Sequence, residues 1–236
     1  DEIKIVAGVA WTFANDKMKS EMDYLLIDEA GQVSLANMVG MSKCCKNIIL
    51  MGDQMQLSQP TQGVHPEDSG VSCLDYLLGE FSTVPSDKGL LLPDTYRLNS
   101  DICNFISSRV YDGRLQSVDV ANSRKIQISN ANLEKESGIC YLPVQHEGNE
   151  QSSTEEVDAI EELVANLLKG KKTDEEGNES SMTPRDILIV SPYNHQIRLL
   201  QEAMGSSFEV GTVDKFQGRE APIVIISMAA SDLESA

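Results

Sequence analysis

Two short acidic segments are the part of this sequence best suited to chemistry. Each follows an apolar run: Asp28-Glu29 comes after residues 24–27, and Gly52-Asp53 comes after residues 48–51. In a parallel α/β sheet, ligands bind in the crevice beyond the carboxyl ends of the strands, so carboxylates delivered there suit a magnesium-nucleotide site. The two segments therefore point to nucleotide hydrolysis. The alternative for Asp28-Glu29 alone is that it merely ends a strand at the surface.

The side chains at these strand ends form a sufficient set for phosphoryl transfer, which depends mostly on positioning and charge stabilisation. Asp28 would hold Mg²⁺, and Glu29 would polarise the attacking water. Asp53 would bind or orient metal-bound water, while Gln56, a neutral donor and acceptor, would sense the γ-phosphate. Gly52 would permit the tight turn from strand to loop.

Short apolar runs alternate with helical patterns along the chain, which predicts parallel βαβ units and therefore an α/β fold. Strands are expected at 3–10, 24–27, 48–51, 90–92, 139–144, 187–191, 210–213 and 223–228. Helices are expected at 101–111, 155–169 and 195–204. The helix at 155–169 has the clearest signals, because Ser153 and Glu156 have capping-box spacing and Gly170 suits its C-terminal cap. Two polar stretches, 59–70 and 170–184, predict loops.

The two acidic segments belong to longer motifs. Asp28-Glu29-Ala30-Gly31-Gln32 and Gly52-Asp53-x-x-Gln56-Leu57 resemble motifs II and III of superfamily 1 helicases. Later segments, in the same order as in that family, resemble motif IV with its following helix, a strand-end segment of the second motor domain, and motif V. They are Thr95-Tyr96-Arg97-Leu98 with Tyr111-x-Gly113-x-Leu115, Ser191-Pro192-Tyr193-Asn194-x-Gln196, and the run from Thr212 to Glu220.

The resemblance implies two RecA-like parallel-sheet domains, the first of them incomplete. Residues 1–92 would hold motifs Ic, II and III, and residues 93–236 would hold motifs IV and V. The nearest subgroup is the branch that unwinds in the 5′-to-3′ sense, and the combined motifs look most like bacterial proteins in which this motor is fused to a RecB-like nuclease. The implied cofactors are ATP and Mg²⁺, and hydrolysis between the two domains would drive movement along a single strand.

The same resemblance assigns nucleotide contacts in the second half of the chain. Tyr96 would stack on adenine, although packing in the core is an equal alternative for an aromatic side chain. Arg97 would act as an arginine finger on the γ-phosphate, and its alternative is a surface salt bridge. Glu220 would bind the ribose, and Gly218 would let the backbone approach the nucleotide.

Polar residues in several motifs are candidates for contacts to the phosphates or sugars of a nucleic-acid strand. They are Thr12, Tyr193, Asn194, Gln196 and Thr212. Hydroxyl and amide groups can bind a backbone without a large positive charge. For Thr12 a helix cap or a packed turn is an equal alternative. Trp11 could stack on a base, but a lone Trp beside a strand end is more often in the core.

The composition describes a globular intracellular protein. The net charge of −18 argues against a general polyanion binder but leaves a local strand-binding surface open. The five cysteines lack paired spacing, so no disulfide framework or zinc site is expected. No segment resembles a signal peptide or a membrane span, which favours a cytoplasmic location. Single-stranded DNA is preferred over RNA as the partner, because of the nuclease-fused resemblance.

The sequence contains no phosphate loop of the form G-x-x-x-x-G-K-[ST], and motif VI with its second arginine is also missing. The chain is therefore expected to be an internal slice of a helicase motor that neither hydrolyses ATP nor unwinds DNA alone. The alternative is a degenerate motor that binds nucleic acid or protein without hydrolysis.

Overall fold

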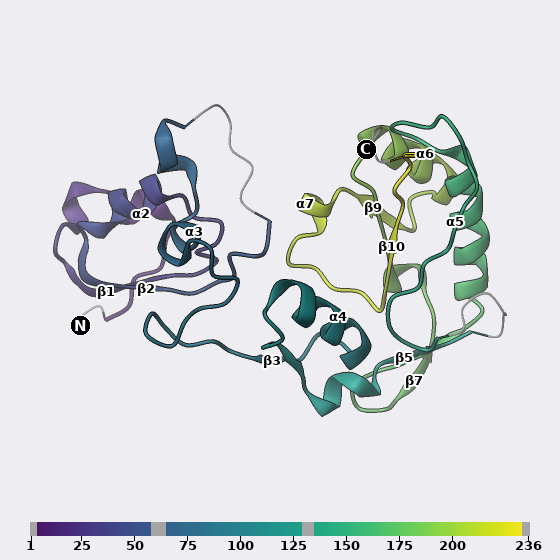
Figure 1. Ribbon diagram of the computed structural model, residues 1–236, viewed down its shortest axis with the longest axis horizontal. Helices are drawn as coiled ribbons and strands as arrows, with labels where there is room; N and C mark the ends of the chain where they lie inside the picture. Colours follow the sequence, from purple (N-terminus) through teal and green to yellow (C-terminus); the bar gives the residue numbers. More distant parts are fainter. Residues whose placement is uncertain (1–3, 58–64, 129–134, 233–236) are drawn as a thin grey trace. The chain divides into compact units, whose positions relative to one another are not determined.

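The computed structural model describes residues 4–57, 65–128 and 135–232, which form two compact units (Figure 1). Unit 1 comprises Asp1–Leu91 and Val110–Asp112, and unit 2 comprises Leu92–Arg109 and Gly113–Ala236. The division expected from the sequence lay between residues 92 and 93 and did not place residues 110–112 with the first unit. None of the helices in the described residues is long and apolar enough to cross a membrane.

Unit 1 is built on two parallel strands, β1 (Met22–Ile27) and β2 (Cys45–Leu50). In the described part of unit 1, three helices accompany them: α1 (Ala10–Phe13), α2 (Leu35–Ser42) and α3 (Cys73–Leu78). Short 3₁₀ turns cover Asp16–Met18 and Glu67–Gly70. The strands, α1, α2 and α3 share one apolar core, whose buried members are Phe13, Leu25, Ile27, Ala30, Met41, Cys44 and Cys73.

The β1–β2 pair is covered on one face only, as far as the described residues show. Leu25 and Ile27 are buried, whereas Tyr24 and Leu26 on the opposite face are 60% and 57% exposed. Ile49, the register partner of Leu26, is also exposed. Parallel sheets normally bury both faces, so this apolar face is unusual for its type.

Unit 2 is built on a parallel sheet with the order β10–β8–β9, whose strands are Ile223–Ile226, Ile187–Val190 and Glu209–Gly211. The central strand β8 is apolar throughout because both of its faces are buried. Helices α5 (Thr154–Leu167) and α6 (Asn194–Met204) pack on one face, and α7 (Val213–Phe216) packs on the other (Figure 1).

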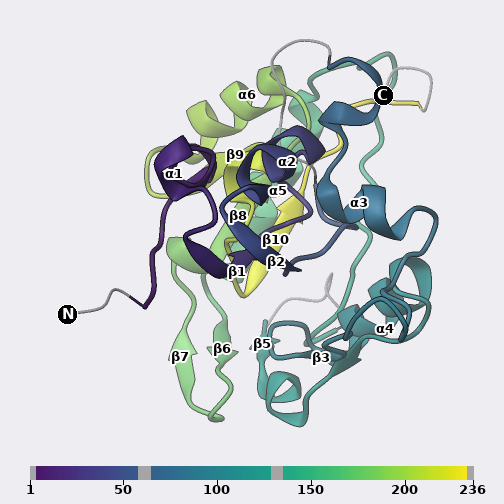
Figure 2. The ribbon, with the colours of Figure 1, turned by 90° about the vertical axis from the view of Figure 1, so that its left-hand side faces the viewer.

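Unit 2 contains two smaller sheets among its described residues. Strand β3 (Asp94–Thr95) pairs in parallel with β4 (Gln116–Ser117), and α4 (Ser100–Val110) runs between them in the chain. The strands β5 (Lys125–Gln127), β6 (Lys171–Thr173) and β7 (Glu179–Ser181) form an antiparallel sheet in which β6 and β7 make a hairpin (Figure 2). Short 3₁₀ turns cover Asp119–Ser123 and Pro184–Asp186.

Most of the expected elements are present. The strands expected at 24–27, 48–51, 187–191 and 223–228 and all three expected helices are confirmed within a few residues. The strand expected at 210–213 is β9, but it ends at Gly211 because Thr212 caps α7. The α/β class with parallel sheets is likewise confirmed.

Three expected strands are wrong: residues 4–9, 90–92 and 139–144 are irregular. Residue 3 of the strand expected at 3–10 and residues 59–64 of the loop expected at 59–70 lie outside the described residues. At 139–144, Pro143 has no N–H for a sheet ladder, and Leu142 and Val144 instead line a groove beside α5. At 90–92, Leu90 and Leu92 are 93% and 84% exposed, so no described strand or core receives them.

The loop expected at 170–184 is also wrong in part, since it contains the β6–β7 hairpin. Asp174 accepts hydrogen bonds from the backbone N–H groups of Glu176 (2.9 Å) and Asn178 (2.8 Å). Such a side-chain-to-backbone turn reverses the chain and lets two polar strands pair. The stretch has no apolar alternation, so nothing in its hydrophobic pattern predicts a strand.

Candidate functional site

The two acidic strand ends lie side by side in unit 1. Ile27 is the register partner of Leu50, so β1 and β2 end together. Beyond the strands, the N–H of Met51 donates to the Ile27 carbonyl at 2.8 Å, and the N–H of Ala30 donates to the Met51 carbonyl at 2.8 Å. The segments Asp28-Glu29 and Gly52-Asp53 therefore form one surface, as parallel strand ends must.

Two glycines allow this close approach. A Cβ on Gly31 would lie 2.3 Å from the Asp53 carbonyl oxygen, and a Cβ on Gly52 would lie 2.7 Å from the Ala30 nitrogen. Gly52 also has a φ of +150°, which side chains disfavour. Any larger residue at either position would push the two strand ends apart.

Glu29 is held in an uncommon conformation. Its φ is +51°, in the left-handed region that non-glycine residues seldom adopt. Its N–H donates to Asp28 Oδ1 at 3.0 Å, and its carbonyl accepts from the N–H of Gln32 at 2.8 Å. Both carboxylates are exposed. Strained residues of this kind are concentrated at functional sites.

Asp53 differs from Asp28 and Glu29 because it is half-buried and both of its carboxylate oxygens accept hydrogen bonds within the protein. Its Oδ1 accepts from the N–H of Met55 at 3.0 Å. Its Oδ2 accepts from the Gln56 side-chain amide at 3.2 Å and from the Tyr111 hydroxyl at 2.6 Å. Burial and this bond to Asp53 raise the pKa of Tyr111 above its ordinary value, so Tyr111 stays protonated and donates.

The residues present fit Mg²⁺ only in part. Among the described residues, no three His, Cys, Asp or Glu side chains gather closely enough to hold a metal by themselves. Magnesium bound with a nucleotide needs only one or two carboxylates, because water and phosphate supply its other ligands. The carboxylates of the exposed Asp28 and Glu29 each accept one hydrogen bond and suit that role, whereas that of Asp53 accepts three and would first have to release a donor.

In unit 2 the structure brings two distant predictions together. Arg97 Nε lies 3.1 Å from Glu220 Oε2, and these side chains are 69% and 66% exposed. The Arg97 carbonyl accepts from Arg124 Nη1 at 3.1 Å, which steadies the backbone there. Tyr96 is 65% exposed, so it does not pack in the core. Gly218 has a φ of +77° and open space around its Cβ position.

Four of the candidate strand-binding residues have accessible or half-buried side chains. Thr212 caps α7 and accepts from the N–H of Lys215 at 3.3 Å. Tyr193 and Asn194 lie at the start of α6, half-buried and exposed respectively. Thr12 is exposed on α1, and Trp11 beside it is 81% exposed rather than in the core.

Gln196, the fifth candidate, is fully buried. Its Oε1 accepts from the N–H of Ser153 at 2.8 Å, and its Nε2 donates to the Ser153 carbonyl at 3.1 Å and to Ser227 Oγ at 2.9 Å. Ser227 in turn donates to Glu156 at 2.5 Å. The side chain of Gln196 thus joins α6 to the start of α5 and is not presented at the surface.

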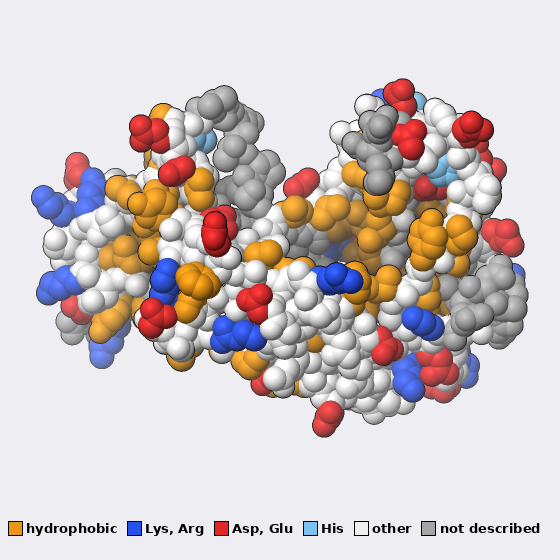
Figure 3. Space-filling view, viewed as in Figure 1, with side chains coloured by type: hydrophobic (Ala, Val, Ile, Leu, Met, Phe, Trp, Pro, Cys, Tyr) orange, Lys and Arg blue, Asp and Glu red, His pale blue; other side chains and the backbone are white. Residues whose placement is uncertain are grey.

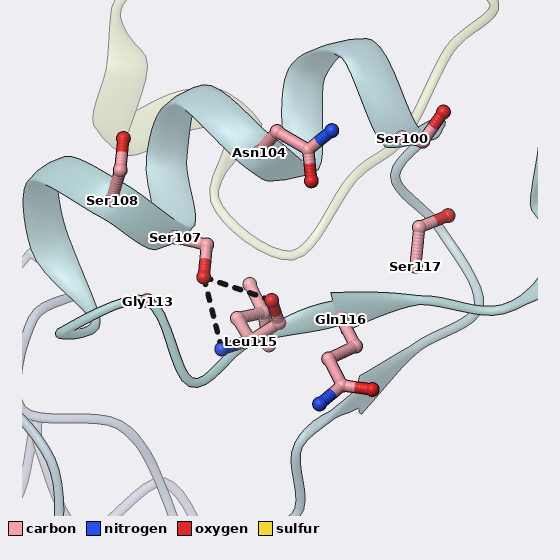
Figure 4. A pocket seen from close by; sticks show the side chains of 8 residues that line it. All are labelled: Ser100, Asn104, Ser107, Ser108, Gly113, Leu115, Gln116 and Ser117. Carbon is pink, nitrogen blue, oxygen red and sulfur yellow. Dashed lines mark hydrogen bonds between the residues drawn. The ribbon is translucent and has the colours of Figure 1, made fainter.

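A polar pocket of about 380 Å³ lies beside α4, and none of the predicted site residues lines it (Figure 4). Ser107 Oγ donates to the Leu115 carbonyl at 2.8 Å and accepts from the Leu115 N–H at 3.0 Å, which closes one wall.

The site residue that the sequence analysis did not predict is Tyr111, which donates to Asp53. Its only sequence signal is its position in the segment Tyr111-x-Gly113-x-Leu115.

Comparisons with known proteins agree with these motifs. A family model described as "AAA domain" (AAA_12) matches residues 73–235, more than half of the chain. The chain is 29% identical over 216 residues to the "DNA replication ATP-dependent helicase/nuclease DNA2" of Gallus gallus, covering 89% of this chain and 20% of that protein. It is 26% identical over 244 residues to the Homo sapiens protein of the same name, covering 89% and 22%.

A third relative is the "DNA polymerase alpha-associated DNA helicase A" of Schizosaccharomyces pombe, 27% identical over 231 residues, covering 89% of this chain and 32% of that protein. The chain spans about a fifth of the length of the DNA2 relatives. The matched family agrees with the order of the helicase motifs along the chain. The chain therefore belongs to the AAA domain family, a superfamily 1 helicase-type family, and is similar to DNA2 helicase/nucleases.

Proposed function

We propose that this chain is a motor segment of an ATP-dependent DNA helicase, with its two units corresponding to parts of two RecA-like domains. The complete protein would use Mg-ATP and move along single-stranded DNA. Its DNA2 relatives carry the words "helicase/nuclease" in their names, which supports a nuclease domain elsewhere in the complete protein.

The observation that carries this proposal is the packing of the two acidic strand ends. Gly31 and Gly52 let the two loops touch, and Asp28, Glu29 and Gln56 in these loops are all exposed. Asp28 would ligate Mg²⁺, and Glu29 would orient and deprotonate the attacking water. Gln56 would sense the γ-phosphate, and Asp53 would act chiefly by holding Gln56.

Unit 2 would supply the remaining nucleotide contacts. Arg97 would stabilise charge on the γ-phosphate, Glu220 would bind the ribose and the exposed Tyr96 would stack on adenine. The Arg97–Glu220 pair is exposed to water, so it costs little to separate when nucleotide binds.

Neutral side chains would hold the DNA strand. Thr12, Tyr193, Asn194 and Thr212 offer hydroxyl and amide groups to phosphates and sugars. On the face shown in Figure 3, acidic and basic side chains are interspersed over both units, so the net charge of −18 does not form one repelling patch there. The names of the relatives favour DNA over RNA.

The direct test is Glu29→Gln in the complete protein, with ATP turnover measured in the presence of single-stranded DNA. Turnover should fall by at least about 100-fold while ATP still binds, because only the base is lost. Glu21→Gln is the matched control, since Glu21 is exposed in unit 1 at the other end of β1. Retained turnover in the Glu29 variant would refute the assigned role.

The 236-residue chain alone should not turn over ATP, because its sequence has no phosphate loop to grip the phosphates. The second candidate is a degenerate motor that binds nucleic acid or protein without hydrolysis. Wild-type complete protein that binds single-stranded DNA but shows no DNA-stimulated ATP turnover would favour that second candidate.

A further inference from the structure

Tyr111 makes a short hydrogen bond to Asp53, in the loop that follows β2 in unit 1. Its hydroxyl donates to Asp53 Oδ2 at 2.6 Å, and the bond is partly buried. Both residues belong to unit 1, because the segment Val110–Asp112 is part of that unit. A hydrogen bond to a charged acceptor is about twice as strong as one between neutral groups. The proton of Tyr111 therefore fixes the orientation of the Asp53 carboxylate.

The same carboxylate oxygen also accepts from Gln56. Gln56 Nε2 lies 3.2 Å from Asp53 Oδ2, so the Gln56 amide is oriented with its nitrogen toward Asp53. An amide nitrogen carries two N–H groups, so one is engaged here and the other can donate to a ligand. Tyr111 therefore contacts Asp53, and Asp53 contacts Gln56. A change at Tyr111 would affect the orientation of Gln56 through Asp53.

Further bonds hold this region of unit 1 together. Thr83 Oγ1 donates to Asp112 Oδ2 at 3.1 Å, next to Tyr111 in the chain. Gln54 Nε2, next to Asp53, donates to the Ser82 carbonyl at 2.6 Å. Asp112 has a φ of +54°, and this left-handed conformation turns the backbone immediately after Tyr111. The bond from Tyr111 to Asp53 therefore joins two segments that are each anchored near residues 82–83.

We propose that Tyr111 is a positioning residue for nucleotide hydrolysis, acting through Asp53 on Gln56. The inference rests on the proposed function, because it assigns Tyr111 to the same nucleotide site. Its hydroxyl keeps Gln56 aimed to donate to the γ-phosphate. Loss of that hydroxyl leaves Asp53 and Gln56 in place but lets them rotate.

The test is Tyr111→Phe in the complete protein, which removes one oxygen atom and keeps the ring. The kcat for DNA-stimulated ATP turnover should fall roughly five- to tenfold, with KM for ATP changed by less than about twofold. Tyr76→Phe is the matched control, because Tyr76 is 56% exposed in α3 of the same unit. A merely structural role would lower thermal stability without this split between kcat and KM.

The route through Gln56 is tested by combining Tyr111→Phe with Gln56→Ala. If Tyr111 acts through Gln56, adding Tyr111→Phe to the Gln56 variant should change kcat by less than about twofold. Independent effects that multiply, or a Tyr111 variant with unchanged kcat, would overturn the inference and leave the proposed function standing. A wild-type complete protein without ATP turnover would overturn both.

Discussion

At the scale of single residues, Gly31 and Gly52 show how the loops at the strand ends depend on backbone contact. The sequence motif containing Gly31 predicts a strand-end turn, and the structure adds that the Asp53 carbonyl occupies the space of a side chain. The sequence could not reveal this contact, because Gly31 and Asp53 are 22 positions apart and meet only in the folded unit.

Gly31→Ala should lower the free energy of unfolding of unit 1 by about 1–3 kcal/mol, since the new Cβ would lie 2.3 Å from the Asp53 carbonyl oxygen. Gly40→Ala in α2 is the control. Its Cβ would meet nothing closer than 3.9 Å, and alanine favours a helix interior over glycine by about 1 kcal/mol. Denaturant unfolding measures both, and equal stability of the two variants would contradict the packing described here.

Gln196 is the residue whose surroundings sequence reasoning could least predict. Its place in a motif suggested contact with a strand, but a polar side chain gives no sequence signal of burial. The amide accepts from the Ser153 N–H and donates to the Ser153 carbonyl, which also accepts from the N–H of Val157. Gln196 thus joins the first turn of α6, which follows Tyr193, to the start of α5.

Gln196→Ala should lower the free energy of unfolding of unit 2 by about 1–3 kcal/mol, because it removes the acceptor of the buried Ser153 N–H and one of the two donors to the Ser153 carbonyl. The matched control is Gln201→Ala, on the same helix but exposed, with one bond to the Val210 carbonyl at 3.3 Å. That control should cost less than about 1 kcal/mol. Weaker DNA binding by the Gln196 variant with unchanged stability would show instead that its amide contacts the strand.

At the scale of elements, prediction succeeded where the hydrophobic pattern and the packing agree. The strand β8 is a continuous apolar run because it is buried on both faces, and α5 shows one apolar face with a Ser153 cap. It failed for the β6–β7 hairpin, which is held by ion pairs and a turn rather than by apolar alternation. Asp186 follows this hairpin, pairs with Lys172 of β6 and is only 7% exposed.

Asp186 provides a pH-dependent test of this element. Burial alone would raise its pKa, but hydrogen bonds from Lys172 and Thr183 outweigh burial and lower the pKa below its ordinary value. A lowered pKa in the folded state means that Asp186 stabilises the fold above the unfolded value of about 3.9. That contribution is lost as the pH falls through the folded pKa.

Asp186→Asn should therefore cost about 1–3 kcal/mol of unfolding free energy at pH 7, because Lys172 loses its charged partner. The difference from wild type should shrink steadily below about pH 4. Glu161→Gln, exposed on α5, should leave stability nearly unchanged at either pH. Thermal unfolding at pH 7 and pH 3 gives the comparison, and an equal loss at both would rule out the ionised carboxylate as the cause.

At the scale of the whole molecule, the chain has separate cores. One core cluster lies in unit 1, with Leu25 and Ile27 at its centre, and the other two lie in unit 2 around β8. Among the described residues, none of these clusters contains side chains from both units. Sequence alone anticipated two halves from the order of strand patterns, but it gave no sign that Val110–Asp112 belongs with the first.

Separate cores predict separate unfolding transitions, because cooperativity follows the shared apolar core. Calorimetry of the chain should show two transitions, and the substitutions above identify them. Gly31→Ala should lower only the unit 1 transition, by about 4–8 °C per kcal/mol for a unit of this size. Gln196→Ala and Asp186→Asn should lower only the unit 2 transition, by about 2–4 °C per kcal/mol. A single transition that every variant moves would mean that the units unfold as one, so that Gly31 and Gln196 stabilise a common fold.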